Sequence, residues 1–425
     1  MLDVIHAITW PEELAFAAHQ LQEIGRASNF PTETLLEILE KWAAALDCPH
    51  VREIPGAAFL RLWLGKRNLE EVLVRELGQA SLYGEWLHCG RGRQRAYPLG
   101  VIGHWPAGNI EIQPILSLTC LLLGGNTCLV RVPSGLIEPT NLLMQKLYEV
   151  DQAELLMKRI FMVSFEHSRL DLHQAMAQAV DGAMIWGGAE AVSQIRSLPF
   201  PHWARVVVFG PRISVGALDA ATWTDRIERG AWCRRIARDV WQFEQQACSS
   251  PQTLFLERDE AGCDPSEFVE VLRCAFAEEN HLHPRSQIEP ALASTVCTAR
   301  ASWLLEDVDN RAWFPESSDW SILLGKGTAI PKPSHGRTLT ILVADKLSDV
   351  ISRFDGSVQT LGLAIHDAAE EEELADVAAR HGVDRVVRLG QMHVFGSPWD
   401  GMDLVRPMVR LVHDARSQGD PRPNP

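Results

Sequence analysis

The stretch that decides the fold runs from residue 97 to residue 132 and reads YPLGVIGHWPAGNIEIQPILSLTCLLLGGNTCLVRV. It opens with a short apolar run between a proline and turn residues, continues with a helix-like segment over residues 111–125, and ends in the apolar run NTCLVRV. Apolar runs without polar alternation, separated by a helix, are typical of parallel strands buried on both faces. The stretch therefore predicts a strand, a helix and a second parallel strand.

The same alternation continues along the chain in two series. The first contains RIFMVSF, SRLDLHQAMAQAV, AMIW, AEAVSQIRSL and ARVVVFG; the second, after Gly210, contains a long helix over residues 224–246, TLFLE, SEFVEVLRCAFAEEN, RTLTILVA, LGLAI, EEEELADVAARHG and DRVVRLG. Repeated strand–helix units predict an α/β protein with two doubly wound parallel-sheet domains. The first hundred residues predict helices joined by turns, including one with a capping box formed by Thr34 and Glu37.

Composition limits the classes of function. The 425 residues are 46% hydrophobic and 22% charged, with a net charge of -15, which disfavours a nucleic-acid partner. The longest apolar stretch, residues 112–123, is shorter than the roughly 20 residues that cross a bilayer. No secretory signal is visible, so we expect a cytoplasmic protein without a membrane span. The nine cysteines stand singly, without zinc-ligand spacing, and we expect reduced thiols and no metal.

One cysteine stands in a setting that suits chemistry. Cys248 lies in QQACSSPQTLFLE, between the long helix and a strand, beside small residues that leave room for another molecule. A thiol on such a turn can act as a nucleophile, whereas Cys120 and Cys128 stand among apolar residues. The alternative is a structural cysteine in a helix-ending turn.

Three further motifs follow predicted strands. GHWPAGNI contains Asn109, whose side-chain NH2 can stabilise a reacting carbonyl oxygen, or which simply forms a turn with its glycine. WGGAEAVSQI places Gly187 and Gly188 before a helix, as a phosphate site or a tight turn. LVRVPSG ends a strand with Arg131, which can reach a phosphate or remain solvated.

In this order the motifs resemble the aldehyde dehydrogenase superfamily, specifically its LuxC-type acyl-CoA reductase branch. RAYPLGVIGHW resembles the first strand and the Pro-Trp-Asn loop, LLGGNTCLVRVPSG the Gly-Asn-Thr strand and Lys-Pro-Ser element, and QQACSSPQTLF the nucleophile segment. VQTLGLAIH resembles the late Gly-Leu-Ala strand, and SPWDG stands where the superfamily has Pro-Phe-Gly-Gly. The agreement spans residues 95–401.

The resemblance implies a domain plan and an assembly. Residues 1–210 would form a helical segment plus the NADP-binding domain, residues 211–395 the catalytic domain, and residues 396–425 a return segment and tail. Residues 85–97 would form an arm for a homo-oligomer, and an acyl-activating or acyl-transfer enzyme is a further possible partner. Arg75, Arg91, Arg93 and Arg95 are candidates to meet CoA phosphates.

The resemblance also assigns residues. It implies Cys248 as the nucleophile and Asn109 as the oxyanion-stabilising residue, although the loop before Asn109 is longer than in the superfamily. Arg131 matches the ribose-binding lysine, and Ser134 replaces a ribose-binding glutamate, which favours NADPH. The remaining matched residues, at the pyrophosphate turn or within the matched loops, are Gly187, Gly188, Trp105, Trp186 and Trp399.

One departure bears on the reaction. Where hydrolytic members carry the glutamate that activates the deacylating water, this chain reads VVFGPRIS, with Val208 or Phe209 near that position. The resemblance thus implies NADPH-dependent reduction of an acyl-CoA to an aldehyde through a thioacyl-Cys248, with release of CoA. The alternatives are a carrier-protein thioester or an acyl phosphate as donor, and a catalytically silent nucleotide-binding scaffold.

Overall fold

The computed structural model describes residues 4–27, 30–79, 84–89, 92–285 and 287–417. The chain forms two compact units: unit 1 consists of residues 1–210 and 395–425, and unit 2 of residues 211–394. Unit 1 is therefore discontinuous in sequence, and unit 2 is inserted into it.

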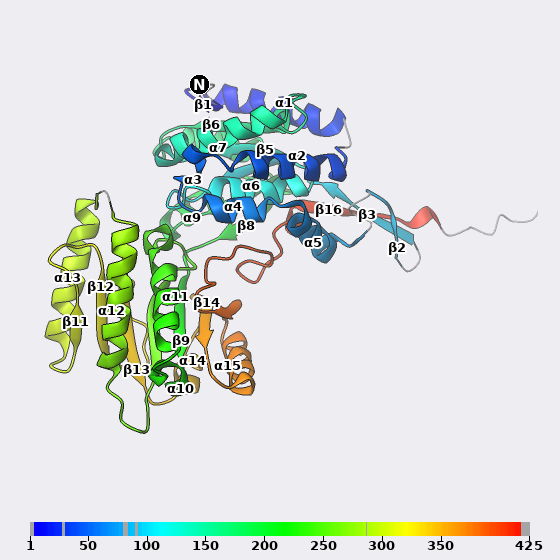
Figure 1. The fold of residues 1–425 in the computed structure, drawn as a ribbon. Coiled ribbons are helices and arrows are strands. Elements are labelled where there is room, and N and C mark those ends of the chain that lie inside the picture. The colour runs from blue at the N-terminus through cyan, green and yellow to red at the C-terminus, as the bar shows by residue number, and fades with distance from the viewer. Residues whose placement is uncertain (1–3, 28–29, 80–83, 90–91, 286, 418–425) are drawn as a thin grey trace, which may run out of the picture. The chain divides into compact units, whose positions relative to one another are not determined.

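Unit 1 is built on a six-stranded sheet with the strand order β1-β6-β5-β4-β7-β8 (Figure 1). Every neighbouring pair is parallel, as the apolar strands predicted. The strands are β1 (Ile5–Ala7), β4 (Val101–Trp105), β5 (Thr127–Arg131), β6 (Ile160–Ser164), β7 (Gly182–Trp186) and β8 (Arg205–Phe209).

Helices cover both faces of this sheet. From β4 the chain moves to β5 and then β6, and from β6 it moves in the opposite direction along the sheet, to β7 and β8. Because such crossovers are right-handed, the helices of the first two connections lie on one face of the sheet and those that follow β6 and β7 lie on the other. All eleven residues of α6 are buried, which explains its apolar character on every side. The helices are α1 (Pro11–Ala27), α2 (Thr32–Ala45), α3 (Pro49–Arg52), α4 (Ala57–Trp63), α5 (Lys66–Leu77), α6 (Gln113–Leu123), α7 (Ile137–Val150), α8 (Leu170–Gln178) and α9 (Ala189–Arg196), with short 3-10 turns η2 (Ser134–Leu136), η3 (Met157–Arg159), η5 (Arg406–Met408) and η6 (Ala415–Ser417).

A small antiparallel sheet completes unit 1, in the order β16-β3-β2. It joins β2 (Leu87–Cys89) and β3 (Gly92–Pro98) to β16 (Val409–Asp414) from the end of the chain. The predicted arm over residues 85–97 corresponds to β2 and most of β3, and residues 90–91 between them lie outside the described residues. Its role in oligomerisation stays a prediction.

Unit 2 contains a seven-stranded sheet with the order β11-β12-β13-β10-β9-β14-β15, in which only β11 is antiparallel to its neighbour. The strands are β9 (Ile213–Leu218), β10 (Pro251–Glu257), β11 (Arg311–Trp313), β12 (Ser321–Lys326), β13 (Thr338–Ala344), β14 (Val358–Ala364) and β15 (Arg385–Arg388). The helices are α10 (Ala220–Thr224), α11 (Arg229–Trp241), α12 (Pro265–Leu282), α13 (Pro290–Glu306), α14 (Leu347–Ile351) and α15 (Ala368–Arg380), with the 3-10 turn η4 (Gln242–Gln245).

The central strand β10 serves two hydrophobic cores. Leu254 and Leu256 pack in the cluster that contains residues of α11 and α12, whereas Phe255 between them packs in the cluster that contains residues of α14 and α15. Alternate side chains of a strand point to opposite faces, so the sheet is covered on both sides (Figure 1). The second predicted parallel sheet is confirmed.

Two local predictions were wrong. The helix that Thr34 and Glu37 were expected to cap begins three residues earlier, at Thr32, with Pro31 at the N-cap and no side-chain cap hydrogen bond. The long helix over residues 224–246 is replaced by α11 and η4, and residue 224 is the last residue of a separate short helix, α10. The last part of the expected helix leaves helical geometry because Phe243 and Glu244 have positive φ angles of 56° and 54°.

Candidate active site

The backbone turns sharply before Cys248. Phe243, Glu244 and Gln245 follow one another with φ angles of 56°, 54° and 59°, in the left-handed region that residues with a Cβ rarely adopt. Each such residue costs about 1 kcal/mol or more. A run of three persists only where its surroundings fix it, and such strain is concentrated at functional sites.

Charged and amide groups of unit 2 fix this turn. The carboxylate of Glu244 forms ion pairs with Arg285, at 2.6 Å, and with Arg337, both of which are buried. The side chain of Gln245 donates to the carbonyls of Pro251 (2.8 Å) and Thr338 (2.9 Å) and accepts from the Thr338 N–H at 2.7 Å. The turn is therefore tied to the strand that follows it, β10, and to β13, the neighbour of β10 in the sheet.

Cys248 itself lies in a turn between η4 and β10. The Ser250 N–H donates to the Ala247 carbonyl at 2.9 Å, and the Ser214 hydroxyl donates to the Cys248 carbonyl at 2.6 Å. Cys248 is partly exposed. Cys248 thus lies between a helical turn and a strand, as predicted, and its role as a nucleophile stays a prediction.

Several other cysteines are unsuited to nucleophilic chemistry. Burial raises the pKa of the Cys120 and Cys128 thiols far above the usual range and that of Cys233 to about 12. The pKa of the exposed Cys263 is raised by its hydrogen bond to Asp259. These four thiols remain protonated at neutral pH.

A hydrogen-bonded chain joins the residue after the cysteine to a buried aspartate. The Ser249 hydroxyl lies 3.0 Å from Nδ1 of His393, and Nε2 of His393 lies 2.7 Å from the Asp239 carbonyl oxygen. Because a carbonyl only accepts, Nε2 carries the proton and Nδ1 accepts from Ser249. Burial lowers the pKa of His393 to about 4, so the ring is neutral at pH 7.

Arg385 belongs to the same neighbourhood. Its guanidinium donates to the carbonyls of Met392 (2.7 Å) and Val394 (2.8 Å) and interacts electrostatically with both Cys248 and Asp239. Burial lowers the pKa of Arg385 to about 10, which leaves it protonated at neutral pH. The sequence analysis missed Asp239, Arg385 and His393.

Asp239 gives the fold a pH dependence. Burial raises the pKa of its carboxyl to about 7. Hydrogen bonds from the N–H groups of Gly390 (2.5 Å) and Met392 (3.4 Å) lower the pKa but do not outweigh burial. The folded state thus binds this proton more tightly than the unfolded chain, and the contribution of Asp239 to stability falls as the pH rises from about 4 to about 7.

We expect Asp239→Asn to remove this dependence, which amounts to on the order of 2–4 kcal/mol between these pH values. The free energy of unfolding in urea, measured at intervals from pH 4.5 to pH 8 for both proteins, checks the prediction. Parallel curves for the two proteins would contradict it.

In unit 1, the predicted cofactor residues meet at one edge of the parallel sheet. Strands β4 and β7 are neighbours, with Trp105 paired to Ile185 near their carboxyl ends. The chain leaves β4 towards β5 and leaves β7 towards β8, in opposite directions. Such a reversal opens a crevice at the carboxyl ends of the strands, where ligands of doubly wound sheets bind.

The loop that carries Asn109 leaves β4 at this edge. The Ala107 N–H donates to Oε1 of Gln113 at 3.1 Å, and Nε2 of Gln113 donates to the Ser117 hydroxyl at 3.1 Å. That hydroxyl lies 2.7 Å from Nε2 of His104, whose pKa burial lowers to about 4. The loop is tied to the core through neutral groups, and Asn109 is exposed.

Arg131 lies at the end of β5, next to β4. Its guanidinium donates to the Phe165 carbonyl at 3.0 Å, and its Nε is buried without a hydrogen-bond partner among the described residues. Trp105 is 3% exposed and donates to Nδ1 of His173 at 3.1 Å, so it forms part of the core behind the edge. Ser134 is exposed in η2.

Trp186 and the two glycines follow β7. The Trp186 ring stacks on Phe209 with 3.8 Å between centroids, and its Nε1 is buried without a partner in the described part of the chain. Gly188 is the N-cap of α9, and a Cβ added there meets no atom within 4 Å. Open space thus lies beside a helix N-terminus, where backbone N–H groups bind anions.

The hydrolytic glutamate is absent from this edge. The resemblance places it near Val208 or Phe209 at the end of β8, and of these Phe209 is buried against the ring of Trp186. Trp399, in the matched SPWDG loop, is also buried, with its ring 4.8 Å from that of Phe395.

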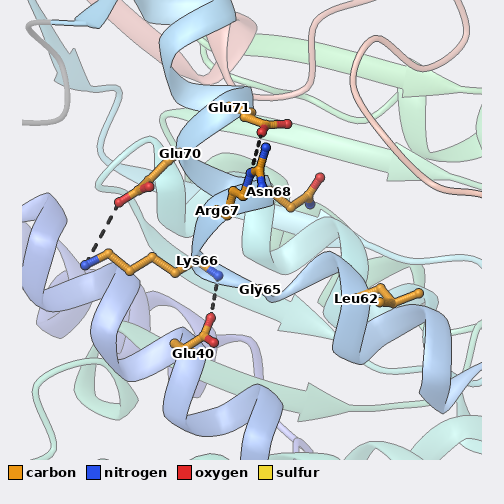
Figure 2. A pocket seen from close by; sticks show the side chains of 8 residues that line it. All are labelled: Glu40, Leu62, Gly65, Lys66, Arg67, Asn68, Glu70 and Glu71. Carbon is orange, nitrogen blue, oxygen red and sulfur yellow. Dashed lines mark hydrogen bonds and ion pairs between the residues drawn. The ribbon is translucent and has the colours of Figure 1, made fainter.

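Two cavities of unit 1 lie away from this edge. One, of about 720 Å³ between α2 and α5, is lined mainly by charged side chains (Figure 2). The Lys66 ammonium pairs with Glu70 and Arg67 pairs with Glu71, while Glu40 accepts the backbone N–H of Lys66. Because carboxylates outnumber cations in this lining, it is not a candidate anion site.

The other cavity, of about 830 Å³, is lined by residues that precede β4 and begin β5, at the opposite edge of the sheet. Of the arginines proposed to meet CoA, only Arg95 lines it. Arg93 is paired with Asp414 at 2.9 Å, Arg75 lies 3.9 Å from Glu76, and Arg91 lies outside the described residues.

The described residues contain neither a membrane-length apolar helix nor a cluster of three or more His, Cys, Asp or Glu side chains arranged for a metal.

Comparison with known proteins places the chain in a family. The family model described as "Acyl-CoA reductase (LuxC)" matches residues 37–411, and the chain belongs to this family. Among curated proteins, the long-chain acyl-protein thioester reductase of Vibrio harveyi is 23% identical over 368 residues, covering 86% of this chain and 74% of the relative. That of Photorhabdus luminescens is 26% identical over 357 residues, covering 82% and 70%.

Solved structures agree on the fold. An aldehyde dehydrogenase from Brucella melitensis biovar abortus 2308 matches with a TM-score of 0.72 and 13% identity, covering 96% of this chain and 90% of that one. A glyceraldehyde-3-phosphate dehydrogenase from Methanocaldococcus jannaschii, complexed with NADP, matches with a TM-score of 0.68 and 11% identity, covering 97% and 98%. The chain has the aldehyde dehydrogenase fold, as its motifs predicted.

Proposed function

We propose that this protein reduces a long-chain acyl thioester to the aldehyde, using a nicotinamide cofactor and an acyl intermediate on Cys248. The observation that carries the proposal is Cys248 itself, a partly exposed thiol on a strained, anchored turn that interacts with the cationic Arg385. Membership of the LuxC family supports the reaction class.

The residues at the β4–β7 edge fit a dinucleotide. The orphaned N–H groups of Arg131 and Trp186 and the open space at Gly188 offer donors and room for phosphates. When bound there, the cofactor would supply the hydride that turns the acyl group into an aldehyde. We propose NADPH rather than NADH, because the positive charge of Arg131 would attract the 2′-phosphate and Ser134, unlike a glutamate, would not repel it.

The chain's own residues would act in two stages. The Cys248 thiolate attacks the thioester carbonyl, a new C–S bond forms, and the donor's sulfur leaves as a thiolate. Asn109 and the Cys248 backbone N–H are proposed to stabilise the negative oxygen in this step and again after hydride addition. The resulting thiohemiacetal collapses to the aldehyde and regenerates the Cys248 thiolate. With Val208 or Phe209 in place of the general base, the acyl-enzyme is proposed to lack the group that would activate water.

The acyl group can be carried to the enzyme by CoA or by a protein. We expected acyl-CoA from the sequence, whereas the curated relatives are named acyl-protein thioester reductases. We propose a protein-bound thioester as the physiological donor, with acyl-CoA as an alternative substrate of the same cysteine. Measuring NADPH oxidation and trapped aldehyde with tetradecanoyl-CoA and with a tetradecanoyl-carrier protein tests this. A higher kcat/KM for acyl-CoA would reverse the assignment, and no aldehyde from either donor would refute the proposed function.

Gly188 offers a test of the cofactor site. We expect Gly188→Val to weaken NADPH binding by about 10-fold or more, because its side chain would fill the space before α9. Titration calorimetry with NADPH checks this. Gly356→Ala is a matched control, since a Cβ there also meets nothing within 4 Å but lies in unit 2. Unchanged NADPH affinity in a folded Gly188→Val protein would show that the cofactor phosphates do not bind at this turn.

Arg131 and Ser134 test the choice of cofactor. Arg131→Gln should weaken NADPH binding by about 10- to 100-fold and NADH binding less, since a charged hydrogen bond contributes about 1.5–3 kcal/mol. Ser134→Glu should shift preference towards NADH. The ratio of kcat/KM values for the two cofactors is the measurement, and an unchanged ratio in both variants would contradict the assignment.

A further inference from the structure

The network around Cys248 contains a histidine that cannot act as the cysteine's base. Nδ1 of His393 accepts the Ser249 hydroxyl proton, and its Nε2 proton is donated to the Asp239 carbonyl. Both ring nitrogens are therefore occupied, and the ring is 6% exposed. His393 is therefore not available as the base that would form the reactive thiolate.

The strand register brings Arg385 towards the cysteine. Ser214 on β9 pairs with Thr360 on β14, and Thr360 pairs with Arg385 on β15, so the three residues form one row across the sheet. Residues in register on parallel strands point to the same face. Arg385 Nη1 lies 3.5 Å from Oγ1 of Thr360, which directs the guanidinium back across β14 towards Ser214. The Ser214 hydroxyl in turn holds the Cys248 carbonyl.

Neutral oxygens hold the guanidinium in this direction. Its donors contact the carbonyls of Gln391, Met392 and Val394, at 2.7–3.3 Å. Carbonyl acceptors satisfy the hydrogen bonds without neutralising the charge. Asp239 holds the other side of the same loop through the N–H groups of Gly390 and Met392. The loop of residues 390–394 thus holds the Arg385 guanidinium and the Asp239 carboxylate in fixed positions relative to each other.

We propose that Arg385 is a positioning residue that holds Cys248 as a thiolate, and that Asp239 limits its effect by competing for the same positive charge. The inference deepens the proposed function, since it explains how the proposed nucleophile is activated. A cation beside a thiol favours the charged form, as the electrostatic interaction of Arg385 with Cys248 and Asp239 indicates. The titratable groups in this network are Arg385, Asp239 and His393, and only Asp239 changes charge near neutrality.

The test is the rate of iodoacetamide alkylation of Cys248 between pH 5 and pH 10, followed by mass spectrometry of its peptide in the full chain. We expect Arg385→Met to move the midpoint of the profile upwards by about one pH unit or more, Arg385→Lys to keep most of the wild-type midpoint, and Asp239→Asn to move it downwards. A purely structural role would not give opposite shifts for Arg385→Met and Asp239→Asn.

An unchanged midpoint in Arg385→Met, or shifts of the same sign in both variants, would overturn the inference. If Arg385→Met fails to fold, Arg385→Gln takes its place: it removes the same charge but keeps an amide that can donate to the loop carbonyls, and we expect it to move the midpoint upwards as well. Alkylation needs neither thioester nor cofactor. A protein that shows these shifts but yields no aldehyde would refute the proposed function alone.

Discussion

Cys248→Ala is expected to lower aldehyde formation from acyl thioesters by at least about 10³-fold. In the proposed reaction every turnover passes through a bond to the Cys248 sulfur, and no other group of the turn can replace it. The Ser249 hydroxyl, next in the chain, is committed to His393. Ser249 is also only 4% exposed, so its hydroxyl is not open to a thioester.

Single-turnover kinetics with saturating NADPH and tetradecanoyl-CoA, or a tetradecanoyl-carrier protein, measure the effect. Cys297→Ala is the matched control, since Cys297 is an exposed cysteine in the same unit, on α13. Aldehyde formation within tenfold of wild type in Cys248→Ala would exclude the acyl-cysteine route.

Glu76→Ala is expected to lower the free energy of unfolding by about 3–5 kcal/mol. The carboxylate of Glu76 is 2% exposed at the end of α5 and accepts from the N–H groups of Leu404 (3.1 Å), Val405 (2.7 Å) and Arg406 (2.8 Å) and from the Ser397 hydroxyl. Alanine leaves the N–H groups of Val405 and Arg406 without this acceptor, and each unsatisfied buried donor costs about 1–3 kcal/mol.

The contacts of Glu76 fasten the segment that returns from unit 2 to unit 1. Urea denaturation followed by circular dichroism checks the prediction. The control is Glu71→Ala on the same helix, whose exposed side chain pairs with the exposed Arg67 and should contribute less than about 1 kcal/mol. Equal losses for the two variants would show that the buried carboxylate has no special role.

The sequence was informative where strands are long and apolar on both sides. The runs that became β4, β5 and β10 are buried along almost their full length, and such runs can be assigned without knowing their partners. The three-residue strands β1 and β11 offered no such pattern, since only Ile5 of β1 is buried and no residue of β11 is. Their pairing depends on distant strands.

The candidate site divides in the same way. Cys248 and Gly188 stand in local patterns, a turn before a strand and a glycine before a helix, that sequence alone can indicate. Asp239, Arg385 and His393 carry no local pattern. His393 meets Ser249 across 144 residues of chain, through a register set by the whole sheet. Long-range hydrogen bonds of this kind are products of the fold and could be found only in it.

Trp105 illustrates the limit of motif matching. Its place at the carboxyl end of β4 suggested a role in lining a pocket, yet its ring is buried and its N–H is donated to His173. Behind the loop of Asn109, it contributes to the core on which that loop rests. A role for Trp105 in cofactor binding stays a prediction. Any such role would be indirect, through the packing that supports the loop.

The central claim, an acyl intermediate on Cys248 that is reduced and not hydrolysed, is tested most directly by trapping it. The protein is incubated with a tetradecanoyl thioester without NADPH, and the peptide containing Cys248 is examined by mass spectrometry before and after NADPH is added. The account predicts a tetradecanoyl adduct on Cys248 that persists without the cofactor and disappears with it as tetradecanal forms. The absence of an adduct from both CoA and carrier-protein donors, or its conversion to tetradecanoic acid, would contradict it.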